Sequence, residues 1–291
     1  MGLATDVSLR LEIVGGMGAM LGESPFWDHG DCIWWVDITG RMLMRTTLST
    51  GTADAWPTPE MPGFVVLASP DNPIVGMERG IYSFSPTRGS FERIVPFIGE
   101  GERFNDATID DTGRLWVSTL ALDNTSGRGA LHRVTGDFRL AVAIDGLTTP
   151  NGLAADAAGG RLFLSDSHPD VQAIWSMPCD FASGMLGARE VFATTRHLGG
   201  RPDGAALASD AGLYWIAGVD GSALYGFAMD GAPAHTFELP FPAPTKLALT
   251  ADGIAITAKG EGGYGGELAI ARDVPPCLRG RPIPFWRPGV A

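Results

Sequence analysis

The sequence predicts an all-β fold, a six-bladed β-propeller with four-stranded blades around a central channel. Two observations predict it. Short apolar runs rich in Val, Ile, Trp and Phe are punctuated by 40 glycines and 21 prolines, and one phrase recurs six times along the chain. Apolar runs of this length between Gly and Pro are typical of strands joined by tight turns, and long amphipathic helical patterns are missing.

The recurring phrase is a turn followed by a hydrophobic strand, and its spacing identifies the blade. The equivalent apolar residues are 41, 41, 47, 51 and 41 residues apart. A period of about 40 to 50 residues is that of a four-stranded propeller blade. The marker residues are Ile33, Ile74, Leu115, Leu162, Leu213 and Ile254.

A ring of blades must close, because an isolated blade cannot bury both of its faces. One blade is therefore expected to combine strands from both ends of the chain. The strand-like run from Val7 to Val14, which precedes the first repeat, is the predicted closing strand. The glycine-rich stretch from Gly260 to Gly266 falls inside the last repeat as a loop, so residues 1–291 are predicted to form a single domain.

Composition narrows the class of protein. A net charge of -12, from 33 acidic and 21 basic residues, disfavours nucleic acid as a partner. Cys32, Cys179 and Cys277 are far apart and odd in number, so neither a disulfide framework nor a zinc-thiolate cluster is expected. Neither a secretion signal nor an apolar run long enough to span a membrane is recognisable, which predicts a cytoplasmic protein without a membrane partner.

Polar residues recur about ten positions before the marker residue in four of the six repeats. We expect them at the turns that lead into the marker strands. Because equivalent positions lie on a ring around the pseudo-symmetry axis, their side chains are predicted to point into one end of the channel. The four residues are Glu23, Asn105, Asn151 and Asp203, whereas the second and sixth repeats have Phe64 and Pro244 there.

Two carboxylates and two amides form a set of hard oxygen donors. Such a set favours Ca²⁺ or Mg²⁺ over a structural zinc ion, and it leaves room for water or substrate on the ion. The phrases Pro150-Asn151-Gly152 and Pro202-Asp203-Gly204 are also good turn sequences, so each alone could be purely structural. The shared spacing, and the presence of Glu, a poor turn former, favour a joint site.

Four phrases in this order resemble the senescence marker protein (regucalcin), gluconolactonase and luciferin-regenerating enzyme family. The resemblance covers at least residues 21 to 230, and it thins after residue 240, where Pro244-Thr245-Lys246-Leu247 is only a loose counterpart of the usual start of the last blade. The phrases are Leu21-Gly22-Glu23-Ser24-Pro25-Phe26-Trp27, Arg103-Phe104-Asn105-Asp106, Pro150-Asn151-Gly152-Leu153 with Ser165-Asp166-Ser167, and Arg201-Pro202-Asp203-Gly204.

The resemblance implies one divalent ion bound by Glu23, Asn151 and Asp203, with Asn105 near or on the metal. Calcium is the first expectation, and zinc, magnesium and manganese stay open. It also implies that Arg103 and Asn105 contact substrate. Asp123 stands where some members of the family carry a glutamate that contacts sugar hydroxyls, which suggests a similar role.

These features together predict a metal-dependent hydrolase that opens a small lactone, such as an aldono-1,4- or 1,5-lactone. The hypothesis is that the ion polarises the lactone carbonyl while Asp203 acts as general base toward an attacking water. Two alternatives stay open: hydrolysis of an organophosphate or another ester at the same site, and a non-catalytic calcium-binding propeller. The expected partner is a small molecule, and the chain is expected to be a monomer or weak homo-oligomer.

Overall fold

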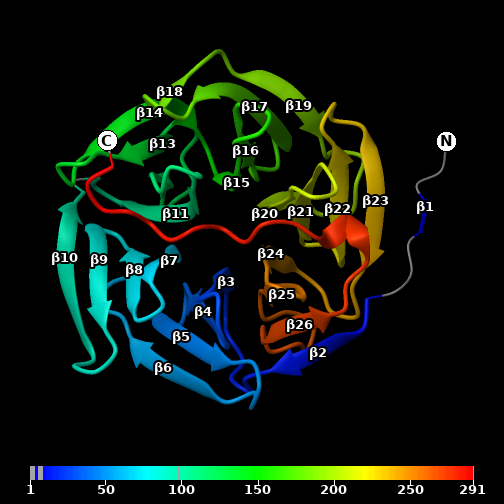
Figure 1. Cartoon of the computed structure of the whole chain (residues 1–291), viewed down its shortest axis with the longest axis horizontal. Helices are drawn as coiled ribbons and strands as arrows, with labels where there is room; N and C mark the ends of the chain where they lie inside the picture. The colour runs from blue at the N-terminus through cyan, green and yellow to red at the C-terminus, as the bar shows by residue number, and fades with distance from the viewer. Residues whose placement is uncertain (1–3, 6–8, 98, 291) are drawn as a thin grey trace.

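The protein, described by a computed structural model over residues 4–5, 9–97 and 99–290, is a ring of six β-sheets around a central channel (Figure 1). Each sheet runs radially from an innermost strand at the channel to an outermost strand at the rim, and innermost strands of neighbouring blades contact one another. The predicted six-bladed propeller is confirmed.

The blades follow one another in chain order. The first contains β3 (Gly22–Trp27), β4 (Cys32–Asp37), β5 (Met42–Thr47) and β6 (Ala53–Pro57), and the second β7 (Phe64–Ser69), β8 (Asn72–Gly76), β9 (Gly80–Ser85) and β10 (Ser90–Pro96). The third contains β11 (Glu102–Ile109), β12 (Leu115–Ala121), β13 (Gly129–Val134) and β14 (Leu140–Leu147). The fourth contains β15 (Pro150–Asp156), β16 (Arg161–Asp166), β17 (Ala173–Asp180) and β19 (Glu190–Thr194), with β18 (Met185–Leu186) also paired to β17. The fifth contains β20 (Arg201–Ala208), β21 (Leu213–Val219), β22 (Ala223–Ala228) and β23 (Pro233–Glu238), and the sixth β24 (Pro244–Leu249), β25 (Gly253–Ala258), β26 (Leu268–Arg272) and β2 (Leu11–Val14).

The marker residues of the repeat lie in the second strand of each blade. These strands are buried on both faces because neighbouring blades sandwich them, which explains their unbroken hydrophobic sequences. Trp35, Trp116 and Trp215 are fully buried in three of them. Each indole N–H has an acceptor, for example Thr46 Oγ1 at 3.0 Å from Trp35 Nε1, so the rings fill the space between blades without leaving an unpaired donor.

Ring closure uses the N-terminal segment as predicted. β2 pairs antiparallel with β26, from Leu11 opposite Ala271 to Val14 opposite Leu268, so the last blade takes three strands from the C-terminal part of the chain and one from the N-terminal part. Residues 6–8, which include the start of the predicted run, lie outside the described residues. The sequence did not predict β1 (Ala4–Thr5), which pairs parallel with β23 of the fifth blade.

The C-terminal segment covers one end of the channel. After the 3₁₀ turn η1 (Pro276–Leu278) the chain crosses the face of the ring (Figure 1). The backbone N–H of Arg281 donates to Ser209 Oγ, that of Trp286 to Leu67 O, and that of Arg287 to Gly113 O, so the segment links three blades. These acceptors lie at or just beyond the C-terminal ends of the innermost strands, which places the segment at that end of the channel. Within the described ranges there is no helix long and apolar enough to cross a bilayer.

Removing residues 1–14 should open the ring, because β26 then loses its outer partner and Val14 loses its buried contacts. We expect the melting temperature to fall by roughly 10 °C or more, given that about 1 kcal/mol corresponds to a few degrees in a protein of this size. Deletion of residues 1–10, which keeps β2, is the matched control. Equal melting temperatures for the two truncations in thermal denaturation would contradict the closing role of β2.

Candidate functional site

The four polar residues singled out from the repeat lie in the innermost strands rather than in turns. Each is at or beside a β-bulge, where the register between the innermost and second strands shifts. A bulge inserts residues without a partner and re-aims side chains, which here brings these side chains to one end of the channel. The interval of about ten residues between each polar residue and its marker residue therefore covers the hairpin that joins the innermost strand to the second strand. The bulges lie between Glu23 and Phe26, Phe104 and Ala107, Asn151 and Ala154, and Pro202 and Ala205.

The two repeats without a matching polar residue differ from each other. In the second blade, β7 pairs regularly from Phe64 opposite Gly76 to Leu67 opposite Pro73. In the sixth blade, β24 has the same bulge as the other four, between Pro244 and Lys246. Five blades therefore share the bulge, and the sixth blade uses it to place a residue that lies two positions beyond the one predicted.

The starts of three innermost strands are held by aspartates in or just after the neighbouring second strand. Asp37 accepts hydrogen bonds from the backbone N–H groups of Met20 and Leu21, just before Glu23. Asp220 pairs with Arg201, two residues before Asp203.

The third of these aspartates, Asp166, has the same function in the fourth blade. It accepts from the backbone N–H groups of Thr148, Thr149 and His168, on either side of the channel end where Asn151 lies. The backbone that presents Glu23, Asn151 and Asp203 is thus fixed by carboxylates.

The polar side chains contact one another across blades. Asn151 Nδ2 donates to Ser167 Oγ at 3.1 Å and also to Asp203 Oδ1 in the next blade. Asn105 Nδ2 donates to Pro150 O at 3.0 Å, the residue before Asn151, and Asn105 Oδ1 accepts from Arg103 at 2.7 Å. Residues from the third, fourth and fifth blades therefore form one continuous network.

Burial changes the acidity of Asp203, which belongs to this network, and of Glu23 in the first blade, whose Oε2 accepts from the backbone N–H of Ser24 at 2.7 Å. Burial raises the pKa of Glu23 to about 7, with the negative charge of Asp106 adding to the rise. Burial, and then the charge of Glu23, raises the pKa of Asp203 well above its usual range. Since each carboxylate destabilises the charged form of the other, the pair is short of positive charge and a cation between them would be bound favourably.

Arg103 supplies part of that positive charge. Its guanidinium is half-buried and donates to Phe104 O at 2.8 Å as well as to Asn105. Burial lowers the pKa of Arg103 to about 10, while the charges of Glu23 and Asp203 raise it, so the side chain stays charged at neutral pH. Arg103 thus faces both carboxylates with donors that a bound molecule could use.

Asp123 lies apart from this network. It is exposed in the loop after β12, and its Oδ1 accepts from the backbone N–H of Thr125 at 3.0 Å and from Thr125 Oγ1 at 2.7 Å. These hydrogen bonds lower the pKa of Asp123. The loop starts at the site end of the channel, since Ala121 pairs with Glu102, so a contact between Asp123 and a bound substrate stays a prediction.

Two charged residues in the channel were not identified from the sequence. Asp106 and Lys246 are each only 2% exposed, and Lys246 Nζ donates to Asp106 Oδ1 and to Ala107 O at 3.1 Å. A lysine inside an otherwise apolar innermost strand was the available signal. It was missed because the ten-residue spacing points to Pro244, whereas the bulge brings Lys246 into the channel.

The two glycines that follow Asn151 and Asp203 are needed for different physical reasons. Gly152, after Asn151, has a φ of +59°, a left-handed conformation that favours glycine, as a turn interpretation predicts. Gly204, after Asp203, does not have a positive φ. A Cβ at Gly204 would lie 2.4 Å from both Cβ and Cγ of Lys246, so this glycine makes room for the lysine side chain.

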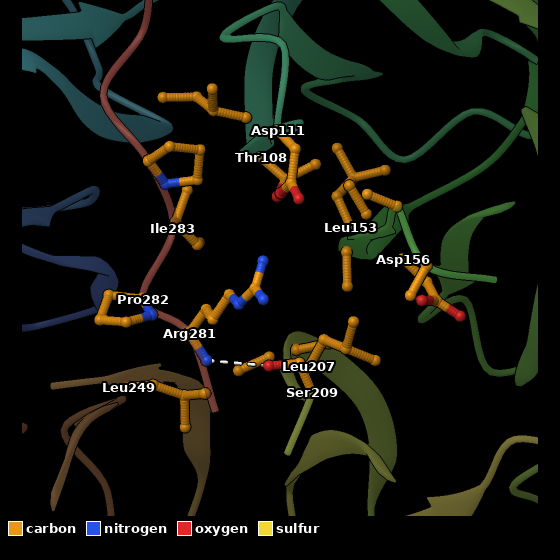
Figure 2. Close-up of a pocket in the computed structure, with 18 of the residues that line it drawn as sticks. Thr108, Asp111, Leu153, Asp156, Leu207, Ser209, Leu249, Arg281, Pro282 and Ile283 are labelled. Atoms are coloured by element: carbon orange, nitrogen blue, oxygen red, sulfur yellow. Dashed lines mark hydrogen bonds between the residues drawn. The ribbon is translucent and has the colours of Figure 1, made fainter. Parts of the chain in front are cut away.

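A cavity lies at the opposite end of the channel, beneath the C-terminal segment. It has a volume of about 210 Å³, and its walls include Leu153, Ala205 and Leu207 from innermost strands. Figure 2 shows Arg281 beside it, with its backbone nitrogen bonded to Ser209 Oγ. Asp156, a buried carboxylate of this cavity, is paired with Arg161 at 3.2 Å. The cavity therefore combines apolar walls with ionisable side chains, and its lining does not include the four predicted site residues.

The donor set at the site end suits an oxygen-preferring cation. Within the described ranges, groups of three or more His, Cys, Asp or Glu side chains placed to hold a metal ion are absent. The site instead combines two buried carboxylates, Glu23 and Asp203, with the amides of Asn105 and Asn151. Carboxylate and amide oxygens are typical ligands of Ca²⁺, so the residues fit the predicted ion in type.

Comparison with known proteins agrees with this geometry. Residues 21–258 match the SMP-30/gluconolactonase/LRE-like region. The chain belongs to this family. The 6-deoxy-6-sulfogluconolactonase of Pseudomonas putida is 32% identical over 266 residues, which cover 89% of this chain and 90% of that protein. The pentonolactonase of Haloferax volcanii is 27% identical over 250 residues, which cover 84% of each protein.

The fold is also that of solved members of the family. The crystal structure of a calcium-binding protein, regucalcin, from Agrobacterium tumefaciens has a TM-score of 0.88 and 21% sequence identity. The similarity covers 98% of this chain and 100% of that chain. The match over residues 21–258 confirms the family resemblance inferred from the sequence motifs. The structural match at low identity shows that the propeller architecture is shared.

Asp166→Ala should destabilise the protein and loosen the position of Asn151, because three backbone N–H groups lose their acceptor. We expect the free energy of unfolding to fall by about 2–4 kcal/mol, the range for removing a buried charged acceptor. Chemical denaturation measures it. Asp170→Ala, on the same loop with a side chain 91% exposed, is the control and should have little effect. Similar losses in both variants would contradict the anchoring role of Asp166.

Proposed function

We propose that this protein is a metal-dependent lactonase that hydrolyses a small sugar lactone, such as an aldono-1,4- or 1,5-lactone, to the hydroxy acid. The observation that carries the proposal is the convergence of Glu23 and Asp203 with two asparagine amides at one end of the channel, where burial raises the pKa of both carboxylates. Such a site has an excess of negative charge that one divalent cation would balance. It also keeps a carboxylate next to that cation, where the carboxylate could accept a proton.

Glu23, Asn151 and Asp203 are the proposed ligands of the ion, with Asn105 beside it or on it. Asn151 presents its amide nitrogen to Asp203, so coordination through its oxygen requires a half-turn of the amide group. The regucalcin with the similar fold is described as calcium-binding, which supports calcium as the first ion to test before zinc, magnesium and manganese. The bound ion would supply electrophilic polarisation of the lactone carbonyl.

Asp203 is the proposed general base. Burial raises the pKa of Asp203 in the metal-free protein, so its surroundings favour uptake of a proton. One carboxylate oxygen would bind the ion and leave the other to accept the proton. Asp203 would take the proton of the attacking water, and ring opening would follow as the carbonyl re-forms and the ring oxygen leaves with a proton. The other carboxylate, Glu23, serves as a ligand.

Arg103 is the proposed substrate clamp. Its charged guanidinium, held by Phe104 O and Asn105 Oδ1, would donate to hydroxyl or carbonyl oxygens of the lactone. Asn105 would share in this contact, and Asp123 would reach substrate hydroxyls from the rim loop. The loops 121–129 and 260–266 both follow strands that end at this mouth of the channel, since Ala121 pairs with Glu102 and Leu21 bridges Lys259. They are therefore placed to set substrate choice.

The relatives support the substrate class. Two of the relatives that share most of their length with this chain are called a sulfogluconolactonase and a pentonolactonase, both names of enzymes that act on lactones of sugar acids. We extend that class to this chain, because the candidate site residues fall inside the matched region, residues 21–258. The partner of the site is accordingly a small molecule.

Asp203→Asn should abolish most of the turnover without unfolding the protein, since it removes the proposed base and one anionic ligand. We expect kcat on an aldonolactone to fall at least about 100-fold, the lower range for loss of a general base. A pH-stat assay of acid release measures it, on protein stripped by chelator and reloaded with each metal. Asp210→Asn, an exposed residue of the same blade at the opposite end, is the control. Near wild-type turnover in Asp203→Asn would remove the aspartate from the chemistry.

The same assay separates the alternatives. Hydrolysis of phosphotriesters but not lactones would favour an organophosphatase at the same site, because a divalent ion polarises P=O as well as C=O. Calcium binding without turnover of any ester would favour a non-catalytic propeller. Chelator-resistant lactone hydrolysis would overturn the metal dependence.

The stability of the metal-free protein should depend on pH through Glu23. Its pKa is raised from 4.5 to about 7, so folding takes up a proton between these values. This contribution is fully present below pH 4.5 and is lost as the pH rises through about 7. Glu23→Gln lacks it, so the stability of the variant relative to wild type should rise by on the order of 2–3 kcal/mol between pH 4 and 8. Denaturation in chelator at each pH tests this, and parallel stability curves would contradict it.

A further inference from the structure

The central channel contains a buried ion pair directly beneath the proposed site. Lys246 of β24 reaches Asp106 of β11, a contact between residues 140 positions apart in the sequence. Lysine and aspartate side chains are almost never fully buried unless they are paired, so the burial of both here indicates that the ion pair has a role in the channel. Lys246 is one of only two lysines in the chain, the other being Lys259 at the rim.

Asp106 is connected to the backbone of the neighbouring blade. Its Oδ2 accepts from the backbone N–H of Leu153 at 2.8 Å, two residues after the proposed ligand Asn151. Its own backbone N–H donates to Ser118 Oγ at 2.9 Å, and Ser118 Oγ in turn donates to Pro150 O at 3.0 Å. Asp106 also directly follows Asn105. The carboxylate therefore sits between two of the proposed ligand positions.

Lys246 is connected to the third ligand position through packing. Its methylene groups lie against Gly204, the residue after Asp203, where even an added methyl group would lie 2.4 Å from them. Its ammonium has Asp106 Oδ1 and Ala107 O as acceptors. The ammonium is thus held by two acceptors inside the protein and is shielded from solvent.

The charges of the pair act on the proposed ligands. The negative charge of Asp106 raises the pKa of Glu23 and of Asp203, and the positive charge of Lys246 lowers that of Glu23. In a buried channel such interactions are screened far less than at the surface. Without the ammonium, three buried carboxylates, Glu23, Asp106 and Asp203, would share one end of the channel, and Arg103 and Arg201 would remain as the cations that act on them.

We infer that Lys246 is a positioning residue of this site that acts as a fixed internal cation, neutralising Asp106 and thereby setting how tightly the channel binds its divalent ion. The inference rests on the proposed function only in requiring that an ion binds at Glu23 and Asp203. It assigns the last blade, whose sequence departs most from the family pattern, a direct electrostatic role in the site. Gly204 is then explained as the gap through which the lysine reaches the axis.

A double-mutant cycle on the full chain tests this role. The variants are Lys246→Met, Asp106→Asn and the double variant, and the affinity for Ca²⁺ alone is measured by calorimetry on metal-stripped protein without substrate. Removing the ammonium should tighten Ca²⁺ binding at least about tenfold, removing the carboxylate should weaken it by a similar factor, and the double variant should bind within about threefold of wild type. Lys259→Met, which removes an exposed ammonium, is the control and should change the affinity less than about twofold.

The signs of these changes separate electrostatic from structural roles. If the pair only braced the fold, both single variants would weaken Ca²⁺ binding, and that result, or an unchanged affinity in Lys246→Met, would overturn the inference. If Lys246→Met does not fold, the comparison between Asp106→Asn and the double variant gives the same information, since both lack the buried carboxylate. There the loss of the ammonium should again tighten binding, by at least about threefold, and no tightening would overturn the inference.

The measurement of Ca²⁺ affinity tests the role of Lys246 independently of lactone hydrolysis. Wild-type protein that binds Ca²⁺ and follows the predicted cycle, but opens no lactone, would remove the proposed function and leave the role of Lys246 supported. Active wild-type enzyme with a cycle of the wrong sign would do the reverse. Wild-type protein that binds none of Ca²⁺, Zn²⁺, Mg²⁺ and Mn²⁺ would overturn both proposals.

Discussion

The constraint on which this structure depends is the gathering of buried carboxylates at one end of a narrow channel. Glu23, Asp106 and Asp203 come from three different blades, and each makes the charged form of another less favourable. Burial alone would protonate or expel such groups. They persist because Arg103 and Lys246 face them as fixed cations and because aspartates such as Asp166 hold the backbone that presents the neighbouring ligands.

The propeller meets this constraint with one local device used five times. A bulge in the innermost strand inserts one extra residue and redirects the neighbouring side chains, so residues at or beside it point toward the channel. What each blade presents there then depends on a single residue choice: carboxylate, amide or ammonium. The second blade keeps a regular strand and presents Phe64, which packs against Phe104 and closes that side of the channel with apolar surface.

The two ends of the channel are chemically distinct. The C-terminal segment lies over the end with the cavity and forms hydrogen bonds with three blades there, whereas Glu23, Arg103 and Asp203 lie at the other end. The Asp106–Lys246 pair stands between them, since Leu153, which donates to Asp106, also lines the cavity. A substrate of the proposed metal site is therefore expected at the end where Glu23 and Asp203 converge, although a cavity of about 210 Å³ lies at the other end.

The sequence by itself determined the number of blades, the closing role of residues 11–14, and the set of polar residues that share one end of the channel. These follow from local geometry, because strand and hairpin lengths fix the period, and equivalent positions in a ring must face the same way. The partner that each side chain meets across the channel was decided by the tertiary structure. Lys246 meets Asp106 only because the ring closes and a one-residue bulge in β24 lies just before the lysine, and Gly204 leaves the space that the lysine needs. Contacts between residues 140 positions apart have no local signature, so spacing could name the ring of ligands but not the ion pair beneath it.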